Sequence, residues 1–507
     1  MLPSIYLIAR EIHVFLPTFR ELPSIKNMKN QLIGRKKERA ILHKALGSNE
    51  AEMVAVIGRR RVGKTFLVRS VYEGKIDLEV TGVQQATRKE QLENFSFLVN
   101  NYLAKGEAIK TPKSWLEAFR QLIIVLEKQK EIKRKVILFF DELPWLASRK
   151  SGFLKGLSFF WNNWASKQSI IVVICGSAAS WMIQKVVKNK GGLHNRISRR
   201  IYLKPFSLRE TEQYFRQRKI RLDRYELLNI YMIMGGVPHY LKEIESGKSA
   251  IQNIDEICFS EGGILKDEFS NLYPALFEQA DSHIAIVRAL AQKWKGFTRK
   301  EIISMAKLPE GGGISKVLDE LISSGFISSY YPFGKKKKDM LYRLTDEYSL
   351  FYLHFIENRR TQEKKIWQRL SQTQTYKSWR GYAFESLCLK HIAQIKKALE
   401  IGGVYSESSS FVFQGDDLRA GIQIDLLIDR NDHAINLCEL KFYNDLYTLD
   451  KASAQNLRRK RAVFIELTKT RKQVFLTLIT SFGLIPNQHS IGLIDQDFNM
   501  DILFEEV

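Results

Sequence analysis

The chain has 507 residues, of which 45% are hydrophobic and 26% are charged, a composition typical of globular protein and not of a disordered chain. Its length exceeds what one compact core needs and predicts roughly two to four domains. The 79 Lys and Arg residues outnumber the 55 Asp and Glu residues and give a formal charge of +24. This excess favours a polyanionic partner, most simply DNA, over the alternative of a basic surface that is merely solvated.

The cysteines and the apolar runs exclude several other classes of protein. The four cysteines form no CxxC pair, which argues against a zinc site or a disulfide framework and for reduced thiols in a cytoplasmic protein. No segment approaches the roughly 18 continuous apolar residues of a spanning helix, so we expect no membrane partner. Residues 1–30 read as an N-terminal extension, because Arg10, Glu11 and His13 interrupt their apolar run.

From residue 31 to 206, strand-like apolar runs alternate with amphipathic helical segments. This alternation predicts an α/β fold with a parallel sheet covered by helices. The expected strands are 53–58, 76–82, 135–142, 169–177 and 199–206. The third and fourth are continuously apolar, as is typical of central strands. Residues 207–278 read as a helical lid, broken at Gly235–Pro238.

The remaining chain shows two further patterns. Residues 279–352 contain three helical segments and then a hairpin whose tip carries lysines 335–338, which predicts a winged helix. Its third helix, 316–325, has few basic side chains, so we expect no sequence-specific readout of bases. A linker helix is expected at 353–377. Residues 378–507 then read as a separate α/β domain, with strands at 404–413, 421–429 and 434–442 followed by a basic helix.

Residues 58–65 match the pattern GxxxxGK[ST], between a buried strand and a helix. Gly58 and Gly63 allow backbone N–H groups to surround a phosphate. Lys64 is expected to reach the β- and γ-phosphates of ATP, and Thr65 to hold Mg²⁺. The residues expected to bind the nucleotide here are Gly58, Arg59, Arg60, Arg61, Val62, Gly63, Lys64, Thr65 and Phe66.

An acidic pair, Asp141 and Glu142, ends the expected strand 135–142. The C-terminal ends of parallel strands meet at one edge of the sheet, so Asp141 is expected to hold Mg²⁺ beside the phosphates. Glu142 is placed to orient the attacking water. Alone, such a pair is as often a solvated strand end, but the loop upstream favours the catalytic interpretation.

These residues resemble the AAA+ superfamily, and most closely the predicted prokaryotic ATPases that carry a winged helix and a restriction-endonuclease-like C-terminal domain. The resemblance implies that Ile33, Gly34 and Arg35 border the adenine. It also implies a sensor role for Ser177 and an arginine finger at Arg196, acting across a subunit interface of a homo-oligomer. The segments that carry the resemblance are LIGR (32–35), GRRRVGKT (58–65), FFDELPWL (139–146), CGSAASWM (175–182), RRIYLKPFS (199–207) and GGVPHYL (235–241).

Alternatives stand beside two of these implied roles. Ser177 could instead cap the following helix. Arg196 competes with Arg199 and Arg200 for the role of finger. A second sensor is also in doubt, because His239 and Tyr240 stand where an arginine would be expected.

The C-terminal domain carries Asp425 on one expected strand and Glu439 and Lys441 on the next. A hairpin would bring the two acids together with the lysine, since alternate residues of a strand share a face. Two carboxylates can hold Mg²⁺ while a lysine stabilises phosphate charge. By spacing alone the pattern is weak, and the alternative is the solvated face of a hairpin.

Glu385, on the preceding helix, adds a third acid. In this order Glu385, Asp425, Glu439 and Lys441 resemble the motif of PD-(D/E)XK nucleases, although Ile424 replaces the usual proline. The resemblance implies metal-dependent phosphodiester cleavage, with metal on Asp425 and Glu439.

The basic run 458–461 lies downstream of these strands and could hold a nucleic-acid backbone. Aromatic residues are not obviously interleaved with it, which favours duplex binding over single-strand stacking. Together these patterns predict an ATP-hydrolysing protein that acts on DNA and carries a nuclease-like domain. The alternative is a nucleotide-controlled switch whose C-terminal domain is an inactive binding module.

Overall fold

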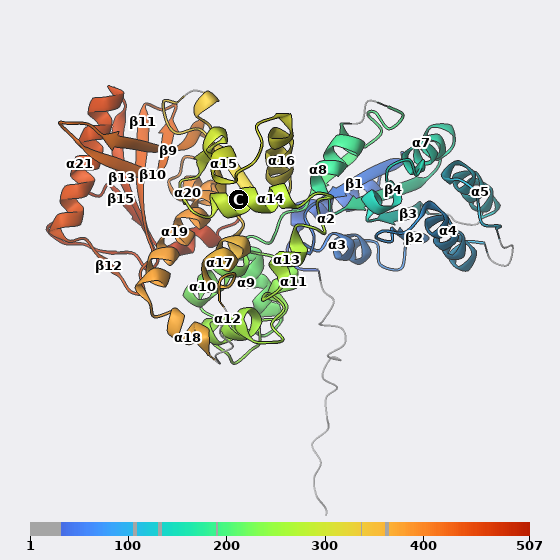
Figure 1. Ribbon diagram of the computed structural model, residues 1–507, viewed down its shortest axis with the longest axis horizontal. Helices are drawn as coiled ribbons and strands as arrows, with labels where there is room; N and C mark the ends of the chain where they lie inside the picture. Colours follow the sequence, from blue (N-terminus) through green and yellow to red (C-terminus); the bar gives the residue numbers. More distant parts are fainter. Residues whose placement is uncertain (1–31, 105–108, 130–133, 189–190, 336, 360–364) are drawn as a thin grey trace, which may run out of the picture.

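The computed structural model describes residues 32–104, 109–129, 134–188, 191–335, 337–359 and 365–507 (Figure 1). The extension expected at 1–30 lies outside them. Figure 1 shows one sheet at each end of the molecule, with a helical region between them. Among the described residues, no helix is long and apolar enough to cross a membrane. All four cysteines are buried and form no disulfide in the structure.

The first sheet is parallel throughout, in the order β2-β3-β4-β1-β5. This confirms the predicted parallel sheet, and the continuously apolar runs do form central strands. Every residue of β4 is buried, because helices cover both faces of the sheet. The strands are β1 (Glu52–Ile57), β2 (Leu78–Thr81), β3 (Val136–Asp141), β4 (Ile170–Gly176) and β5 (Arg199–Tyr202).

Alternate residues of these strands feed two separate cores. Val54 and Val56 pack with helices α2 (Lys36–Leu46) and α3 (Lys64–Val71). Met53 and Ala55 point to the opposite face. That face is covered by α4 (Arg88–Tyr102), α5 (Trp115–Lys128) and α7 (Phe153–Asn163). Short helices α6 (Leu143–Leu146) and α8 (Ala179–Met182) follow β3 and β4, and further short turns lie at Ala165–Lys167 and Ile183–Val187.

A helical region follows the first sheet, as the sequence predicted. It is interrupted at Gly235–Gly236, between the end of α10 and the start of α11 at Pro238. The helices are α9 (Leu208–Gln217), α10 (Arg224–Met234), α11 (Pro238–Leu241), α12 (Ala250–Phe259) and α13 (Glu268–Leu272).

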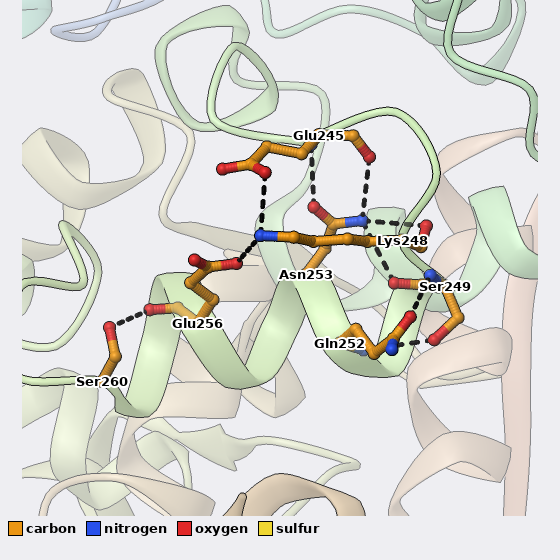
Figure 2. A network of polar contacts seen from close by, with 7 residues as sticks. All are labelled: Glu245, Lys248, Ser249, Gln252, Asn253, Glu256 and Ser260. Carbon is orange, nitrogen blue, oxygen red and sulfur yellow. Dashed lines mark hydrogen bonds and ion pairs between the residues drawn. The ribbon is translucent and has the colours of Figure 1, made fainter. Parts of the chain in front are cut away.

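The start of α12 shows why a helix begins where it does (Figure 2). Ser249 accepts a hydrogen bond from the backbone N–H of Gln252, whose side chain accepts from the backbone N–H of Ser249. This capping box satisfies two of the N–H groups that a helix start leaves free. Asn253, one turn in, accepts from the N–H of Glu245 at 2.8 Å and donates to three carbonyls upstream. The loop before α12 is therefore fixed to its first turn.

Three helices and a hairpin then follow in the predicted order. The helices are α14 (Asp281–Leu290), α15 (Arg299–Met305) and α16 (Gly312–Ser323). The hairpin strands are β7 (Ile327–Tyr330) and β8 (Leu341–Leu344), which pair antiparallel. A two-residue strand that the sequence did not suggest, β6 (Phe297–Thr298), joins them in the order β6-β8-β7. A 3-10 turn, Lys337–Asp339, lies at the hairpin tip.

Four helices lead to the C-terminal sheet: α17 (Glu347–Phe355), α18 (Ile366–Leu370), α19 (Gln374–Lys390) and α20 (Ile392–Ala398). The expected boundaries at residues 352 and 377 fall inside α17 and α19, so continuous helices cross both. One hydrophobic core runs from Phe206 to Phe504 through this region. The helical region and one face of the C-terminal sheet are therefore packed together.

The C-terminal sheet has the order β15-β13-β11-β10-β9. The three predicted strands form its antiparallel half, β9 (Ser406–Gly415), β10 (Ala420–Arg430) and β11 (Ala434–Lys441). β13 (Gln473–Thr480) and β15 (Gln496–Phe498) add parallel neighbours. The basic helix α21 (Lys451–Thr468) covers one face, while α19 packs against the other. Minor elements are β12 (Tyr447–Thr448), β14 (Leu484–Ile485) and the final turn Met500–Phe504.

Candidate functional site

The GxxxxGK[ST] motif forms a tight loop between β1 and α3. Gly63 has φ 90° immediately before the helix, and Arg61 has φ 71°, so the backbone turns through left-handed conformations. A Cβ at Gly58 would approach the carbonyl oxygen of Leu203 to 2.3 Å, which is closer than any side chain tolerates. The loop thus has the curled backbone that a phosphate-binding loop requires.

The Lys64 side chain lies inside this loop. Its residue is only 5% exposed, and its Nζ donates to the backbone oxygen of Arg59 at 3.0 Å. A buried amine on the first residue of α3 adds its charge to the positive end of that helix. The residues therefore fit the β- and γ-phosphates of a nucleotide.

Thr65 and Asp141 connect the loop to the edge of the sheet. The Thr65 hydroxyl donates to Oδ2 of Asp141 at 2.6 Å, although β4 separates β3 from β1, the strand that leads into the loop. A hydroxyl and a carboxylate side by side are the hard oxygen ligands that Mg²⁺ prefers. The two residues predicted to hold Mg²⁺ are thus brought together and fit that ion.

Glu142 is held by Ser177 at the ends of neighbouring strands. Its backbone is left-handed, with φ 46°. Its Oε2 accepts hydrogen bonds from the Ser177 backbone N–H at 3.1 Å and from the Ser177 hydroxyl at 2.7 Å. The alternative role of Ser177 as a helix cap is not seen, because the N-cap of α8 is Ala178 and makes no side-chain cap. Ser177 instead fixes the Glu142 carboxylate next to Asp141.

The segment expected at the adenine lies against the end of the loop. The Arg35 N–H donates to Oε1 of Glu210 at 2.8 Å, and its guanidinium donates to the Val62 oxygen at 3.4 Å. The same guanidinium lies 4.5 Å from the centroid of the Phe206 ring. Arg35 is therefore beside Val62, whereas the role expected for residues 33–35 at the adenine stays a prediction. Phe66, in contrast, is 43% exposed on α3.

The side chains of Arg59 and Arg61 form ion pairs with acids outside the phosphate-binding loop. Arg59 forms a buried ion pair with Asp346, the N-cap residue of α17. Arg61 forms an ion pair with Glu268 on α13. Burial alone would lower the pKa of Arg59, but the adjacent Asp346 raises it above its ordinary value. These arginines contribute backbone to the loop, while their charges are neutralised by distant acids.

The segment Gly235–Leu241 also contacts the Arg61–Glu268 ion pair, through Tyr240. The Tyr240 hydroxyl donates to Oε1 of Glu268 at 2.9 Å, and the Arg61 guanidinium lies 5.9 Å from the centroid of the Tyr240 ring. Burial, and next the charge of Arg61, lower the pKa of His239 to about 4. His239 is therefore a neutral side chain beside the loop, in a position where the sequence left a second sensor in doubt.

The arginine-finger candidates are distinguished in part. Arg199 forms an ion pair with Glu52 at 2.5 Å within its own chain. Arg196 and Arg200 are both exposed. Of the three candidate arginine fingers, Arg199 is therefore already engaged in an ion pair within its own chain. The structure does not bring Arg196 to the phosphate-binding loop of its own chain.

In the C-terminal sheet, Glu439 is clamped between two lysines. The Lys441 amine lies 2.9 Å from Oε1 of Glu439, and the Lys460 amine lies 2.7 Å from Oε2. Burial favours a neutral Glu439, but the two lysines prevail and lower its pKa. Lys460 belongs to the basic run 458–461, and its amine forms an ion pair with Glu439. The sequence had suggested only a backbone-binding role for that run.

Asp425 lies where β10 is irregular. Its pairing with β9 shifts register between Ile424 and Leu427, as in a β-bulge, a feature that re-aims side chains at functional sites. Burial, and next the charge of Glu439, raise the pKa of Asp425. Burial and the Asp425 charge likewise raise the pKa of Glu385. The three predicted acids therefore share one electrostatic neighbourhood.

This neighbourhood is not a ready three-acid metal site. Within the described ranges, no three His, Cys, Asp or Glu residues come together as a metal-ligating group. Glu385, the third acid of the motif, therefore does not join Asp425 and Glu439 in such a group, and two lysines occupy the oxygens of Glu439. One face of these strands is apolar, since a single core contains Leu426, Ile428, Cys438 and Leu440.

A curled loop around a lysine, joined through Thr65–Asp141 to an acidic pair on a parallel sheet, defines a P-loop ATPase-type domain. Residues 32–244 match the family model of an ATPase domain found predominantly in Archaea. The matched residues extend over the first sheet and the first helices that follow it.

Three similar proteins illustrate the range of likeness. An uncharacterized protein of Methanocaldococcus jannaschii is 23% identical over 435 residues, covering 83% of this chain and 92% of that protein. The Walker-type ATPase of Pyrococcus abyssi has 16% identity and a TM-score of 0.46, over 64% of this chain and 97% of that one. The ORC2 protein of Aeropyrum pernix has 15% identity and a TM-score of 0.39, over 64% and 95%. With scores this low, the two structural likenesses add nothing to the assignment.

Proposed function

We propose that this protein binds ATP with Mg²⁺ and hydrolyses it. The observation that carries the proposal is the hydrogen bond between Thr65 and Asp141, next to the Glu142–Ser177 pair. It unites the two halves of a hydrolytic site that the sequence separates by 76 positions. Mg²⁺, held by Thr65 and Asp141, would supply positive charge to the phosphates. Glu142, fixed by Ser177, orients the attacking water, and Lys64 holds the transferred phosphate.

The direct test compares Lys64→Ala with Lys155→Ala in the full chain. Lys155 is an exposed lysine on α7 of the same domain. Binding of labelled ATP and release of phosphate are measured for both. We expect Lys64→Ala to lose both signals and Lys155→Ala to keep them. Binding that survives in Lys64→Ala at the wild-type level would refute the proposed site.

We further propose that the partner is DNA and that the residues after 278 form a winged helix and a nuclease-like domain. The net charge of +24 supports a polyanionic partner. The helix order α14, α15, α16 followed by the β7–β8 hairpin supports the winged helix. The grouping of Asp425, Glu439 and Lys441 supports the nuclease-like domain. An exposed Arg196 suits a finger supplied to a neighbouring subunit, which would make the active form an oligomer.

Cleavage is tested separately from ATP hydrolysis. Purified protein is incubated with plasmid, ATP and either Mg²⁺ or Mn²⁺, and nicking and phosphate release are followed together. Asp425→Ala should abolish nicking and leave phosphate release unchanged. Wild-type protein that nicks no plasmid with either metal would remove the nuclease proposal and leave the ATPase proposal intact.

The second candidate function, a nucleotide-controlled switch, is favoured by the two ion pairs of the loop. Arg59–Asp346 and Arg61–Glu268 join the phosphate-binding loop directly to elements outside the ATPase domain. A change in the loop would therefore be transmitted to α13 and α17. Steady-state kinetics separate the two functions. DNA accelerates turnover in a hydrolase that does repeated work, whereas a switch turns over slowly and retains its nucleotide.

A further inference from the structure

A cavity of about 540 Å³ lies between the β7–β8 hairpin and the C-terminal sheet. Residues 292–295 and the hairpin form one wall, while α19, β9 and β10 form the other. Asp425 and Glu385 both line it. A volume of this size is typical of sites that take a small molecule. It suits one nucleotide and excludes a double helix.

An aromatic stack borders this cavity. The rings of Trp294 and Tyr382 lie 5.0 Å apart at an interplanar angle of 13°, and Trp294 also stacks on His354 at 5.1 Å. Trp294 and Tyr382 both line the cavity, and Tyr382 is 40% exposed. The exposed ring of Tyr382 therefore offers a flat apolar surface beside the acids. Stacking on such a ring is how proteins hold unpaired bases of any sequence.

Cationic and polar groups complete the lining. The guanidinium of Arg343 donates to Ser328 through Nε at 3.3 Å and forms no ion pair within the described part of the chain. Lys295, exposed at the rim, accepts a hydrogen bond at its backbone oxygen from Tyr330 at 2.6 Å. The Ser408 hydroxyl is buried without a partner among the described residues. Arg343 and Lys295 are available to a phosphate, and Ser408 to a polar group of a ligand.

The cavity is built by two parts of the chain that are fastened together. The N–H of Phe333, after β7, donates to the Ser410 oxygen of β9 at 2.7 Å. The Phe333 ring lies 5.6 Å from that of Phe464 on α21. The hairpin is thus held against the C-terminal sheet, and the aromatic, basic and acidic residues keep fixed relative positions.

We propose that this cavity receives one nucleotide of a single-stranded nucleic acid. The base stacks on Tyr382, the adjoining phosphate contacts Arg343 and Lys295, and the strand passes Asp425. The inference rests on the proposed nucleic-acid function and names its substrate class. It revises the expectation of duplex binding, because three-dimensional folding gathers aromatic residues that the sequence keeps far apart.

The test uses the full chain in EDTA, so that neither cleavage nor ATP turnover is needed. Anisotropy of a fluorescent oligo(dT) is compared with that of a blunt DNA hairpin at the same salt concentration. Wild-type protein should bind the single strand more tightly. Tyr382→Ala should weaken single-strand binding about fivefold to a hundredfold. Its matched control is Tyr331→Ala, which removes a tyrosine that is 42% exposed, follows β7 and lies outside the cavity lining.

A substitution of an exposed residue tests the same site without the risk of unfolding the protein. Lys295→Ala should weaken binding of the single strand severalfold and reduce the salt dependence of that binding. Lys300→Ala, an exposed lysine on α15, should leave both unchanged. Phosphate release from ATP, measured for every variant in a separate assay with Mg²⁺ and no EDTA, reports that the fold is intact.

Four results would overturn the inference. Equal affinities for the single strand and the blunt hairpin would refute the single-strand inference and leave the proposed DNA partner standing. Absence of all DNA binding would refute both the inference and the proposed DNA partner. Equal affinities of Tyr382→Ala and Tyr331→Ala would show that the stack is not the site. Thymidine monophosphate is also tested as a competitor of the oligo(dT). If it displaces the strand at equal nucleotide concentration, the cavity is a site for free nucleotides instead.

Discussion

Arg59 of the phosphate-binding loop forms a buried ion pair with Asp346, which lies 287 positions further along the chain. Asp346 also caps α17, where it accepts hydrogen bonds from the Ser349 N–H at 2.9 Å and hydroxyl at 2.7 Å. Burial favours a neutral Asp346, but Arg59 and Ser349 hold its pKa below the ordinary value. One carboxylate thus fixes both the loop and the start of a helix in another part of the molecule.

Asp346→Asn should destabilise the protein by about 3–5 kcal/mol at neutral pH, because it leaves Arg59 buried without its counter-charge. Urea unfolding measures this loss. The control is Asp416→Asn, which breaks an exposed pair with Arg419 and should have far less effect, because water screens that pair. Since the folded pKa of Asp346 is lowered, its contribution is present at neutral pH and is lost as pH falls through that pKa. The prediction fails if the two variants unfold alike.

Glu142→Gln should bind ATP normally and hydrolyse it at least about a hundredfold more slowly, because an amide cannot polarise the attacking water. Ser177→Ala should have a smaller effect of the same kind, since it only frees the Glu142 carboxylate. Single-turnover phosphate release and equilibrium nucleotide binding are the two measurements. Equal rates in wild type and Glu142→Gln would assign the water to another residue.

His239 should make the stability of the protein depend on pH between about 4 and 6.5. Burial and Arg61 lower its folded pKa to about 4, so in this range the unfolded chain binds more protons than the folded chain. Stability is therefore lost as pH falls through this window. Melting temperatures should fall less steeply for His239→Gln than for wild type. His433→Gln, which removes an exposed histidine, should follow the wild-type curve, and identical slopes for all three proteins would contradict this account.

Gly236→Ala should disrupt the junction between the first sheet and the helices that follow it. A Cβ there would lie 1.9 Å from the Phe206 oxygen, in the place where the Phe206 N–H donates to the Gly236 oxygen at 2.6 Å. We expect urea unfolding to show a loss of at least about 1–3 kcal/mol, as in overpacked cores. Gly381→Ala is the matched control. That glycine lies within α19, and a Cβ added to it would meet nothing within 4 Å, so alanine should be neutral or stabilising. Equal stability of the two variants would contradict the prediction.

The sequence predicted the first sheet and the loop because their signals are local. The spacing of Gly58, Gly63 and Lys64 determines a loop within eight residues, and apolar runs such as 169–177 specify a buried strand without any knowledge of neighbours. The strand order was not predictable, since nothing in 135–142 states that β4 separates β3 from β1. The hydrogen bond between Thr65 and Asp141 follows from that order.

The partners of the site residues were missed for a related reason. Glu210, Glu268 and Asp346 neutralise or bind arginines of the nucleotide site, yet each is one acid among fifty-five and stands in no motif. Lys460 was assigned to a basic helix, and only the packing of α21 on the sheet brings its amine to Glu439. The stack of Trp294 on Tyr382 likewise joins residues from separate segments. Long-range pairing of single residues leaves no periodic trace in a chain.

The acids that neutralise Arg59 and Arg61 have a practical consequence for dissecting this protein. Asp346 and Glu268 both lie beyond residue 244, where the match to the ATPase family ends. A fragment cut at that boundary would expose two uncompensated guanidinium groups next to its active centre. Such a fragment would attract phosphate and other anions indiscriminately, and binding constants obtained with it would not describe the intact protein.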